Sequence, residues 1–565
     1  MRYSGFILLA AASGIEAVAL DPRVTSLGPS ATATEADWFQ TRPQSYQGKK
    51  HCHYIVKTVS HTSNTGVTAT GTAPMLAETN PAPFGQKTYV PNAPLETSEP
   101  IKGAKNRNIF HLMGNLSPYF TSEEGFGVAE YPLPEGSDIT QVHLIHRHGS
   151  RYPSDSETIA AFAQRIVNAT AHGTKFTGDL AFLNEYSWSQ GMNVLVPMGR
   201  QELFDSGVLH YYNYGSLYRN GSKLVVRSTT SDRALKSAEN FLAGFFGLEW
   251  RDYANILPLI SGGGFNSSLT GMSVCRNAGK IFSSLENDAM RTWQGIYLKD
   301  KTQKLRKMAS GFNWTVSDSA DAQTLCAYET VSFGYSSFCQ LFDYEEWEGY
   351  SYASSIVSSS LMGFGSPISR ATGIAWVQEF LARVESHLLD VAPGQTSANL
   401  TLATNPVTFP LDQPLYFDFG HDASILAALS AFGIRQFADY LPPTGPPTHK
   451  QFDAGKITPF AGRLNIEIIE TLHAVKTRRP RGENERSYIS GTGKTRYVHF
   501  LLNQRTVPLH ASFKECEYRD DGWCELSTFL EVQKGSLGKA QFQYSCEGNW
   551  TVGPYGSVTD GVPPQ

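Results

Sequence analysis

Three segments of the chain repeat one pattern, in which a short apolar run is followed by a polar loop and then by apolar residues at helical spacing. They cover residues 139–167, 223–247 and 415–432. A short apolar run bounded by turn residues predicts a buried strand, and apolar residues three to four positions apart predict an amphipathic helix. Strands that alternate with helices are typical of an α/β fold with an open sheet.

The three predicted strands end at His146, Arg227 and Phe419. In open α/β sheets, ligands bind in the crevice beyond the carboxyl ends of the strands. Each segment places arginines or histidines there, so the sequence predicts a ligand site at these strand ends. Ser154 and Glu157 have the spacing of a capping box at the start of the first helix.

The remaining sequence indicates how the chain is divided into domains. Residues 251–400 are mostly helical in pattern, as in 371–391, and are predicted to form a helical cap. This cap interrupts a predicted α/β domain made of residues 72–250 and 401–565. Residues 20–71 are predicted to form a mobile N-terminal arm.

The N-terminus has the pattern of a secretory signal peptide over residues 1–19. Arg2 precedes an apolar run, and small residues at 17 and 19 fit a cleavage site. The chain is therefore predicted to be secreted. Sequons for N-glycosylation fit this compartment and lie at Asn115, Asn168, Asn220, Asn266, Asn313, Asn399 and Asn549.

Seven cysteines in a secreted chain predict disulfides with one thiol left over. The predicted pairs are Cys326 with Cys339, Cys516 with Cys524, and Cys275 with Cys546. The remaining Cys52 lies between His51 and His53. Because adjacent residues of an extended chain point apart, a solvated loop is favoured there over a metal site.

Charge argues against several partners. The formal net charge is -5, which argues against a nucleic-acid partner, and no segment after the signal peptide is apolar enough to span a membrane.

The basic run 476–481 is interpreted as a solvated loop. The stretch 490–496 resembles a P-loop but lacks its first glycine, because position 488 is Tyr488.

The stretch Arg147-His148-Gly149-x-Arg151 concentrates positive charge, which a fold tolerates where an anion lies between the charges. Guanidinium groups match phosphate oxygens, so the predicted anion is a phosphoryl group. His148 is either a further hydrogen-bond donor or a nucleophile that forms a phosphohistidine. The neighbouring arginines would keep its imidazole neutral in acid.

His421 and Asp422 follow the third predicted strand. Asp422, if desolvated, would hold its proton in mild acid and act as the general acid for the leaving oxygen. His421 would bind a phosphate oxygen.

The sequence Arg147-His148-Gly149-x-Arg151-x-Pro153 resembles the R-H-G-x-R-x-P signature of the histidine acid phosphatases, and His421-Asp422 resembles their H-D motif. The stretches "TGTAPMLAETNPAPF", "GFGVAEYPLPEG" and "TPFAGRL" are similar to fungal phytases, and the similarity covers nearly the whole chain after residue 67. The resemblance implies a large α/β domain of the phosphoglycerate-mutase type, a smaller helical domain, a covalent phosphohistidine, and no metal or other cofactor.

The resemblance also implies roles for individual residues and a substrate class. The implied nucleophile is His148, the proton donor is Asp422, and the phosphate binders are Arg147, Arg151, Arg227 and His421. The implied substrate is a small-molecule phosphate ester, with phytate (myo-inositol hexakisphosphate) among the esters hydrolysed.

Two features depart from fungal phytases. Those that favour phytate often carry a basic F-K-G-K-Y-A-F-L segment at the substrate rim, whereas here Thr177 and Asp179 replace its two lysines. A broad acid phosphatase is therefore the alternative within this family. Residues 49–66 interrupt the similarity and are predicted to be either a translated intron or an added loop.

Two other functions share features with this sequence. A phosphoglycerate mutase shares the R-H-G start, but secretion and the His421-Asp422 pair argue against it. An inactive phosphate-binding protein is the other alternative, and it is disfavoured because both His148 and Asp422 are present.

Overall fold

The computed structural model describes residues 108–564, except 155–156, 220, 285–287 and 480–492. The predicted signal peptide, the N-terminal arm, the 49–66 interval and Cys52 lie outside the described residues. Within the described part of the chain, no helix has the length and apolar character needed to cross a membrane.

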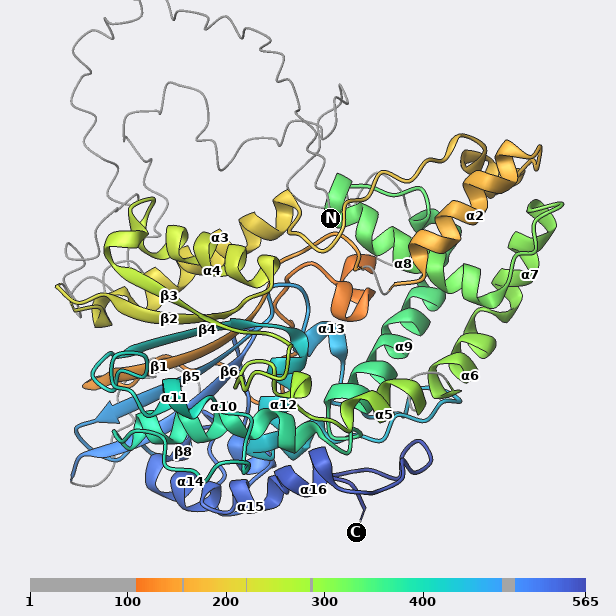
Figure 1. Ribbon diagram of the computed structural model, residues 1–565. Coiled ribbons are helices and arrows are strands. Elements are labelled where there is room, and N and C mark those ends of the chain that lie inside the picture. Colours follow the sequence, from red (N-terminus) through yellow and green to blue (C-terminus); the bar gives the residue numbers. More distant parts are fainter. Residues whose placement is uncertain (1–107, 155–156, 220, 285–287, 480–492, 565) are drawn as a thin grey trace, which may run out of the picture. The chain divides into compact units, whose positions relative to one another are not determined.

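The fold is built on a mixed sheet with strand order β3-β2-β4-β1-β5-β6-β7, and β8 pairs with β6 (Figure 1). Strands β1 to β4 run parallel, whereas β5 to β8 pair antiparallel. The carboxyl ends of β1, β2 and β4 meet because β4 pairs in parallel with both neighbours. The strands are β1 (Ser137–Arg147), β2 (Leu224–Thr229), β3 (Ala254–Leu259), β4 (Leu415–Gly420), β5 (Arg463–Thr471), β6 (Thr495–Leu502), β7 (Arg505–Thr506) and β8 (Cys524–Glu525).

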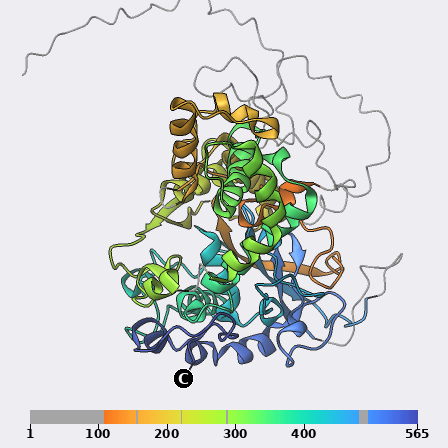
Figure 2. The same cartoon turned by 90° about the vertical axis from the view of Figure 1, so that its right-hand side faces the viewer.

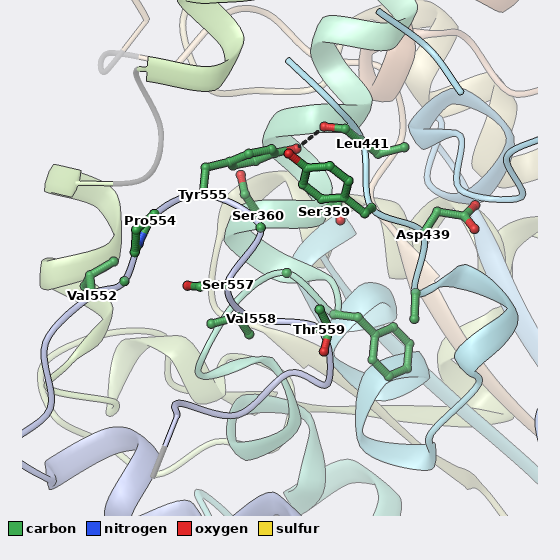
Figure 3. Close-up of a pocket in the computed structure, with 16 residues that line it drawn as sticks. Ser359, Ser360, Asp439, Leu441, Val552, Pro554, Tyr555, Ser557, Val558 and Thr559 are labelled. Carbon is green, nitrogen blue, oxygen red and sulfur yellow. Dashed lines mark hydrogen bonds between the residues drawn. The ribbon is translucent and has the colours of Figure 1, made fainter. Parts of the chain in front are cut away.

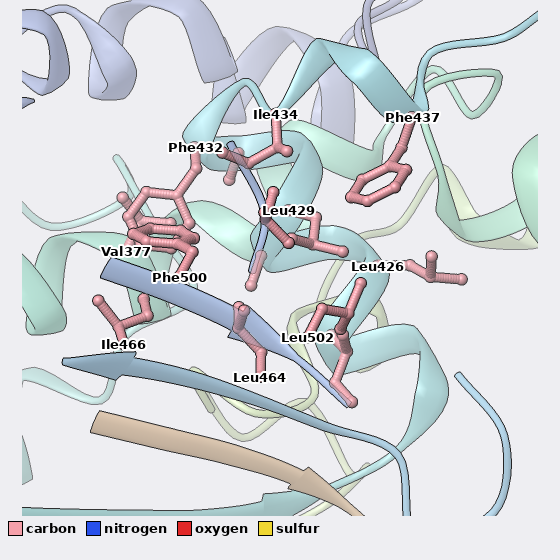
Figure 4. Packing of buried hydrophobic residues seen from close by; sticks show 14 of the residues in the cluster. Val377, Leu426, Leu429, Phe432, Ile434, Phe437, Leu464, Ile466, Phe500 and Leu502 are labelled. Atoms are coloured by element: carbon pink, nitrogen blue, oxygen red, sulfur yellow. The ribbon is translucent and has the colours of Figure 1, made fainter. Parts of the chain in front are cut away.

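Helices cover both faces of this sheet, which confirms the predicted α/β class (Figures 1 and 2). Helices α3 and α4 bury their apolar sides on one face, where Phe241 packs with Phe417 of β4. Helices α10 and α12 lie on the other face, and Figure 4 shows Leu429 and Phe432 of α12 above Leu464 and Phe500 of the antiparallel strands.

The principal helices have the following bounds. They are α2 (Ile159–Ala171), α3 (Pro197–Tyr214), α4 (Asp232–Phe246), α5 (Ala278–Ser284), α6 (Asp288–Tyr297), α7 (Lys299–Met308), α8 (Val316–Phe333), α9 (Tyr344–Met362), α10 (Ser369–Val384), α11 (Leu400–Ala403), α12 (Asp422–Phe432), α13 (Ala454–Ile457), α14 (Leu526–Gln533), α15 (Ser536–Ala540) and α16 (Phe542–Glu547).

A second apolar cluster holds together the helices to the right of the sheet in Figure 1. It joins α2 and the 3-10 helix η6 (Gly178–Glu185) with α7, α8 and the start of α9. The range predicted as a cap, 251–400, supplies much of this cluster. That range also contains β3, an edge strand of the sheet, and α10, which packs with α12. Helix α2, from the range predicted as α/β domain, packs in the second cluster.

The C-terminal segment packs against α9 and the loop of residues 438–441 (Figure 3). Tyr555 donates a hydrogen bond from its hydroxyl to the Leu441 carbonyl oxygen at 2.7 Å. Gly561 donates from its backbone nitrogen to the Phe364 carbonyl oxygen at 2.9 Å. These contacts join the C-terminal segment to the loops that follow α9 and the 3-10 helix at Arg435–Phe437.

Three disulfides confirm the predicted pairing of six cysteines. They are Cys275–Cys546, Cys326–Cys339 and Cys516–Cys524. The interpretation of 476–481 as a solvated loop is wrong for Arg479, which is fully buried. Arg479 pairs with Asp521 at 3.3 Å and donates to the Pro132 carbonyl oxygen at 2.6 Å, because a buried guanidinium requires such partners.

Candidate active site

His148 follows directly after β1 and is fixed by backbone contacts on both sides. Its nitrogen donates to the Gly420 carbonyl oxygen at 3.1 Å, and its carbonyl oxygen accepts from Ala461 at 2.9 Å. The ring atom Nδ1 lies 2.9 Å from the Gly149 carbonyl oxygen. Since a carbonyl oxygen only accepts, Nδ1 carries the proton, and the lone pair of the neutral ring is on Nε2.

The His148 imidazole is held neutral. Its side chain is buried, and burial lowers its pKa well below the usual value because a charged ring is poorly solvated there. The positive charge of Arg147 lowers the pKa further, followed by His421, Arg151 and Arg233. An unprotonated Nε2 is the form of the ring that is nucleophilic. The sequence attributed the neutral ring to the arginines, whereas burial is the larger cause.

Gly149 allows the loop after β1 to pack closely on α3. A Cβ at this position would lie 2.2 Å from the Gly199 carbonyl oxygen, so a larger residue would displace the loop. Glu202 of α3 holds the next residue, because its carboxylate accepts from the Ser150 nitrogen at 2.7 Å and from the Ser150 hydroxyl at 3.0 Å. The two contacts fix the direction in which His148 points.

Arg147 lies at the carboxyl end of β1 and is almost fully buried. Its Nη2 pairs with Asp422 Oδ2 at 3.1 Å, and its Nη1 donates to the carbonyl oxygens of Asn115 and Thr458. The guanidinium also lies over the Phe460 ring at 4.7 Å. The Nε atom is buried without a hydrogen-bond partner among the described residues.

Asp422 begins α12, and in this structure it is an ionised partner of Arg147. Burial raises its pKa, but Arg147 and the Asn115 amide lower it more, and the resulting pKa is about 2. The expectation that desolvation alone would keep Asp422 protonated in mild acid is therefore wrong for the ligand-free site. Asn115 Nδ2 donates to Asp422 Oδ2 at 3.1 Å, so the atom to which a glycan would attach at this sequon is already engaged.

His421 lies beside His148, with 5.4 Å between the ring centroids. Its Nε2 is 3.4 Å from the Thr229 hydroxyl at the end of β2. Burial, followed by the charge of Arg233, lowers its pKa to about 4. His421 therefore has a neutral ring at pH 5 and can donate one hydrogen bond to an oxyanion.

Arg151 faces the second apolar cluster and contacts Glu157. Both of its Nη atoms lie 3.3 Å from Glu157 Oε1, which also accepts from the hydroxyl of Tyr328 of α8 at 2.7 Å. Glu157 accepts from Ser154 as a capping box would require, but α2 begins later, at Ile159. The predicted pair therefore holds the loop and positions Arg151 rather than capping the helix.

Arg227 does not lie with the side chains around His148. The prediction that Arg227 binds phosphate is therefore wrong. It lies within β2 rather than at its end, directly opposite Asp418 of β4. Its Nε and Nη2 donate to Asp418 at 2.6 and 2.7 Å, and its Nη1 donates to Glu379 of α10 at 2.6 Å. All three nitrogen atoms are thus committed to buried carboxylates.

Arg233, which sequence reasoning missed, lies in the first turn of α4. Its charge lowers the pKa of both His148 and His421, and its own pKa is lowered by burial and then by Arg151. Its buried Nε has no hydrogen-bond partner among the described residues. Its place after the strand end, in a helix N-terminus, was the available sequence signal.

The structure therefore brings six charged or titratable side chains together near the strand ends. They are His148, Asp422, Arg147, Arg151, Arg233 and His421. Arginines around a neutral imidazole suit transfer of a phosphoryl group.

Comparison with known proteins agrees with this geometry. Residues 138–503 match the family model of the histidine phosphatase superfamily (branch 2). Phytase A of Aspergillus fumigatus is 30% identical over 439 residues, which cover 74% of this chain and 87% of the relative. Phytase A of Aspergillus terreus is 30% identical over 461 residues, covering 78% and 90%.

Solved structures share the fold. The phytase of D. castellii aligns with a TM-score of 0.60 at 21% identity, covering 78% of this chain and 88% of that one. The Bifidobacterium longum multiple inositol polyphosphate phosphatase in complex with phosphate aligns with a TM-score of 0.52 at 14% identity, covering 76% and 97%. From the matched residues and the curated relatives, the chain belongs to the histidine phosphatase superfamily, branch 2.

Proposed function

We propose that this protein is a secreted acid phosphomonoesterase of the phytase type that works through a covalent phosphohistidine on His148. The observation that carries the proposal is a neutral imidazole with a free Nε2, surrounded by Arg147, Arg151 and Arg233. The family membership and the Phytase A relatives support the same reaction class.

In the first step, Nε2 of His148 forms a bond to phosphorus while the bond from phosphorus to the ester oxygen breaks. The arginines and His421 take the phosphoryl oxygens. The leaving alkoxide needs a proton, and Asp422 is the acid positioned to supply it.

Binding of the substrate provides that proton. At pH 5 a phosphate monoester is mostly a monoanion, because its second pKa is about 6. The substrate oxygens pair with Arg147 and bring negative charge next to Asp422, so the pKa of Asp422 rises from its ligand-free value of about 2. The substrate proton can then pass to Asp422 and on to the leaving oxygen. In the second step, water attacks phosphorus, the bond to Nε2 breaks, and Asp422 accepts the water proton.

The charge of the residues that would contact the organic part of the substrate affects the choice between phytate and simpler esters. Thr177 and Asp179, the predicted replacements for rim lysines, are exposed at the start of η6. Glu157 adds a carboxylate beside Arg151. An acid and a neutral residue in place of two lysines attract a polyanionic substrate less, which favours the second candidate function, a broad acid phosphatase with little preference for phytate.

Phosphate release at about pH 5 from phytate and from p-nitrophenyl phosphate separates these functions. A higher kcat/KM on phytate supports the phytase, and a higher value on the small ester supports the broad phosphatase. Release from neither substrate contradicts both and supports a phosphate-binding protein.

The role of Asp422 is tested with two leaving groups. Asp422→Asn should retain turnover of p-nitrophenyl phosphate, whose leaving group departs without a proton, and should lose turnover of an alkyl phosphate. Equal loss on both substrates would contradict a role as proton donor.

Secretion is supported by three disulfides and by the N-terminal pattern. Mass spectrometry of the protein from culture medium tests secretion, because it identifies the first residue that remains after removal of the signal peptide. The same digest tests the 49–66 interval, because a peptide containing "HYIVK" would exclude the intron interpretation.

A further inference from the structure

A cavity of about 350 Å³ lies where α12 ends, bordered by the loop of residues 512–515 and by α14 and α15. Its volume is at the lower end of the range for small-molecule sites. The residues that line it include none of the active-site residues described above. The cavity is therefore separate from the phosphatase site.

The lining of this cavity carries more cations than carboxylates. The cations are Arg370, Arg435, Lys514 and Lys539, and the lining acid is Glu515. Lys514 and Lys539 are exposed and pair with no acid among the described residues. Asp560 of the C-terminal segment is shared between the two arginines. A concave surface with this imbalance concentrates anions.

The Arg370 side chain is buried and held in place by its neighbours. Its side chain is 6% exposed and lies beside the Phe364 ring, 5.6 Å from its centroid. Nε and Nη2 donate to Asp560 at 2.6 Å each. Nη1 has no hydrogen-bond partner among the described residues, and it lies 3.5 Å from where a Cβ on Gly433 would stand. Arg370 and Gly433 both line the cavity, so this donor is available at its wall.

We propose that this cavity is a second anion site, which binds a small molecule carrying more than one phosphate group. Arg370 and Arg435 would bind one phosphate by their guanidinium groups. Lys514 and Lys539 would bind another as point charges at the edge. A cavity of this volume exceeds the needs of a single phosphate ion, and its four cations outnumber the two acids, Glu515 and Asp560, which leaves a positive excess for a multiply charged ligand.

Isothermal titration calorimetry with inositol hexasulfate, a polyanion that a phosphatase does not hydrolyse, tests the site in the full-length protein. The wild type should bind two equivalents, one in each site. Lys514→Gln combined with Lys539→Gln should lose about 100-fold in affinity for one equivalent only, because two charge-assisted contacts are removed. Hydrolysis of p-nitrophenyl phosphate should be unchanged in this variant.

The matched control is Lys223→Gln combined with Lys476→Gln, which removes two exposed lysines that do not line the cavity. This control should retain both equivalents. Hexasulfate binding that is equal in both variants, or no binding to the wild type, would overturn the proposal. If inorganic phosphate binds the cavity as tightly as the hexasulfate, the site takes a single phosphate and the assignment to a polyanion is wrong.

Discussion

Two groups of arginines, both partly or fully buried, differ in how their charge is balanced. In the first, between β2, β4 and α10, Arg227 and Arg383 meet Asp418 and Glu379. In the second, at the strand ends, Arg147 and Arg151 contact Asp422 and Glu157. Arg233 is added there without any ion pair to a described residue.

The difference separates a structural cluster from a catalytic one. Two arginines and two carboxylates neutralise one another, and every nitrogen of Arg227 has a partner. Three arginines with two contacting carboxylates leave one positive charge and several open donors. A fold retains such an excess where a ligand supplies the missing negative charge.

The largest expected effect is the loss of activity when His148, which the excess positive charge surrounds, is replaced. His148→Ala should lower kcat on the order of 10⁵-fold, because it removes the nucleophile. Initial rates with p-nitrophenyl phosphate measure this. Thermal unfolding of the variant should match the wild type, and substantial activity in the folded variant would contradict the covalent mechanism.

Arg227→Ala tests the balanced cluster. We expect a loss of about 3–5 kcal/mol in the free energy of unfolding, because Asp418 and Glu379 are left buried without their main partner. Urea unfolding measures the loss. The kcat/KM of the protein that remains folded should be close to that of the wild type, and a selective loss of activity would restore Arg227 to the phosphate site.

Arg233→Ala is the matched experiment in the other cluster. The expected loss is about 10² to 10³-fold in kcat/KM, the usual effect of removing one donor to a developing charge. The free energy of unfolding should stay the same or rise, because a half-buried cation without an ion pair is removed. A variant with wild-type kinetics but lower stability would contradict the distinction between the clusters.

The pH dependence of stability gives the smallest effect. His421 has a pKa of about 4 in the fold and about 6.5 when unfolded, so the unfolded state binds more protons between these values. The free energy of unfolding should therefore fall as the pH falls from 6.5 to 4, by up to about 3 kcal/mol from this residue. Asp418, with a pKa of about 2, contributes a loss only below about pH 4.

Urea unfolding across this range, repeated with His421→Asn, measures the contribution. The variant should show a shallower slope between pH 6.5 and 4, because its amide does not titrate. An unchanged slope would mean that other buried groups, such as His210 with a pKa of about 4, account for the dependence.

The sequence predicted β1, β2 and β4 and placed His148 and His421 after two of them, because these features depend on local pattern, whereas β3 lies in the range predicted as a helical cap. His148 and His421 lie at strand ends that apolar runs define within one or two residues. Arg227 was misassigned because the strand continues to Thr229, and alternation directs the Arg227 side chain toward α10. The low pKa of Asp422 depends on Arg147 and Asn115, whose approach is tertiary and leaves no local signal.

The most direct test of the account is to trap the phosphoenzyme. The protein is mixed with a ³²P-labelled monoester at pH 5, quenched in alkali within one turnover and digested for mass spectrometry. The account predicts an alkali-stable, acid-labile phosphoryl group on the peptide that contains His148, and its absence from His148→Ala. Turnover without any labelled peptide, or label on another residue, would contradict it.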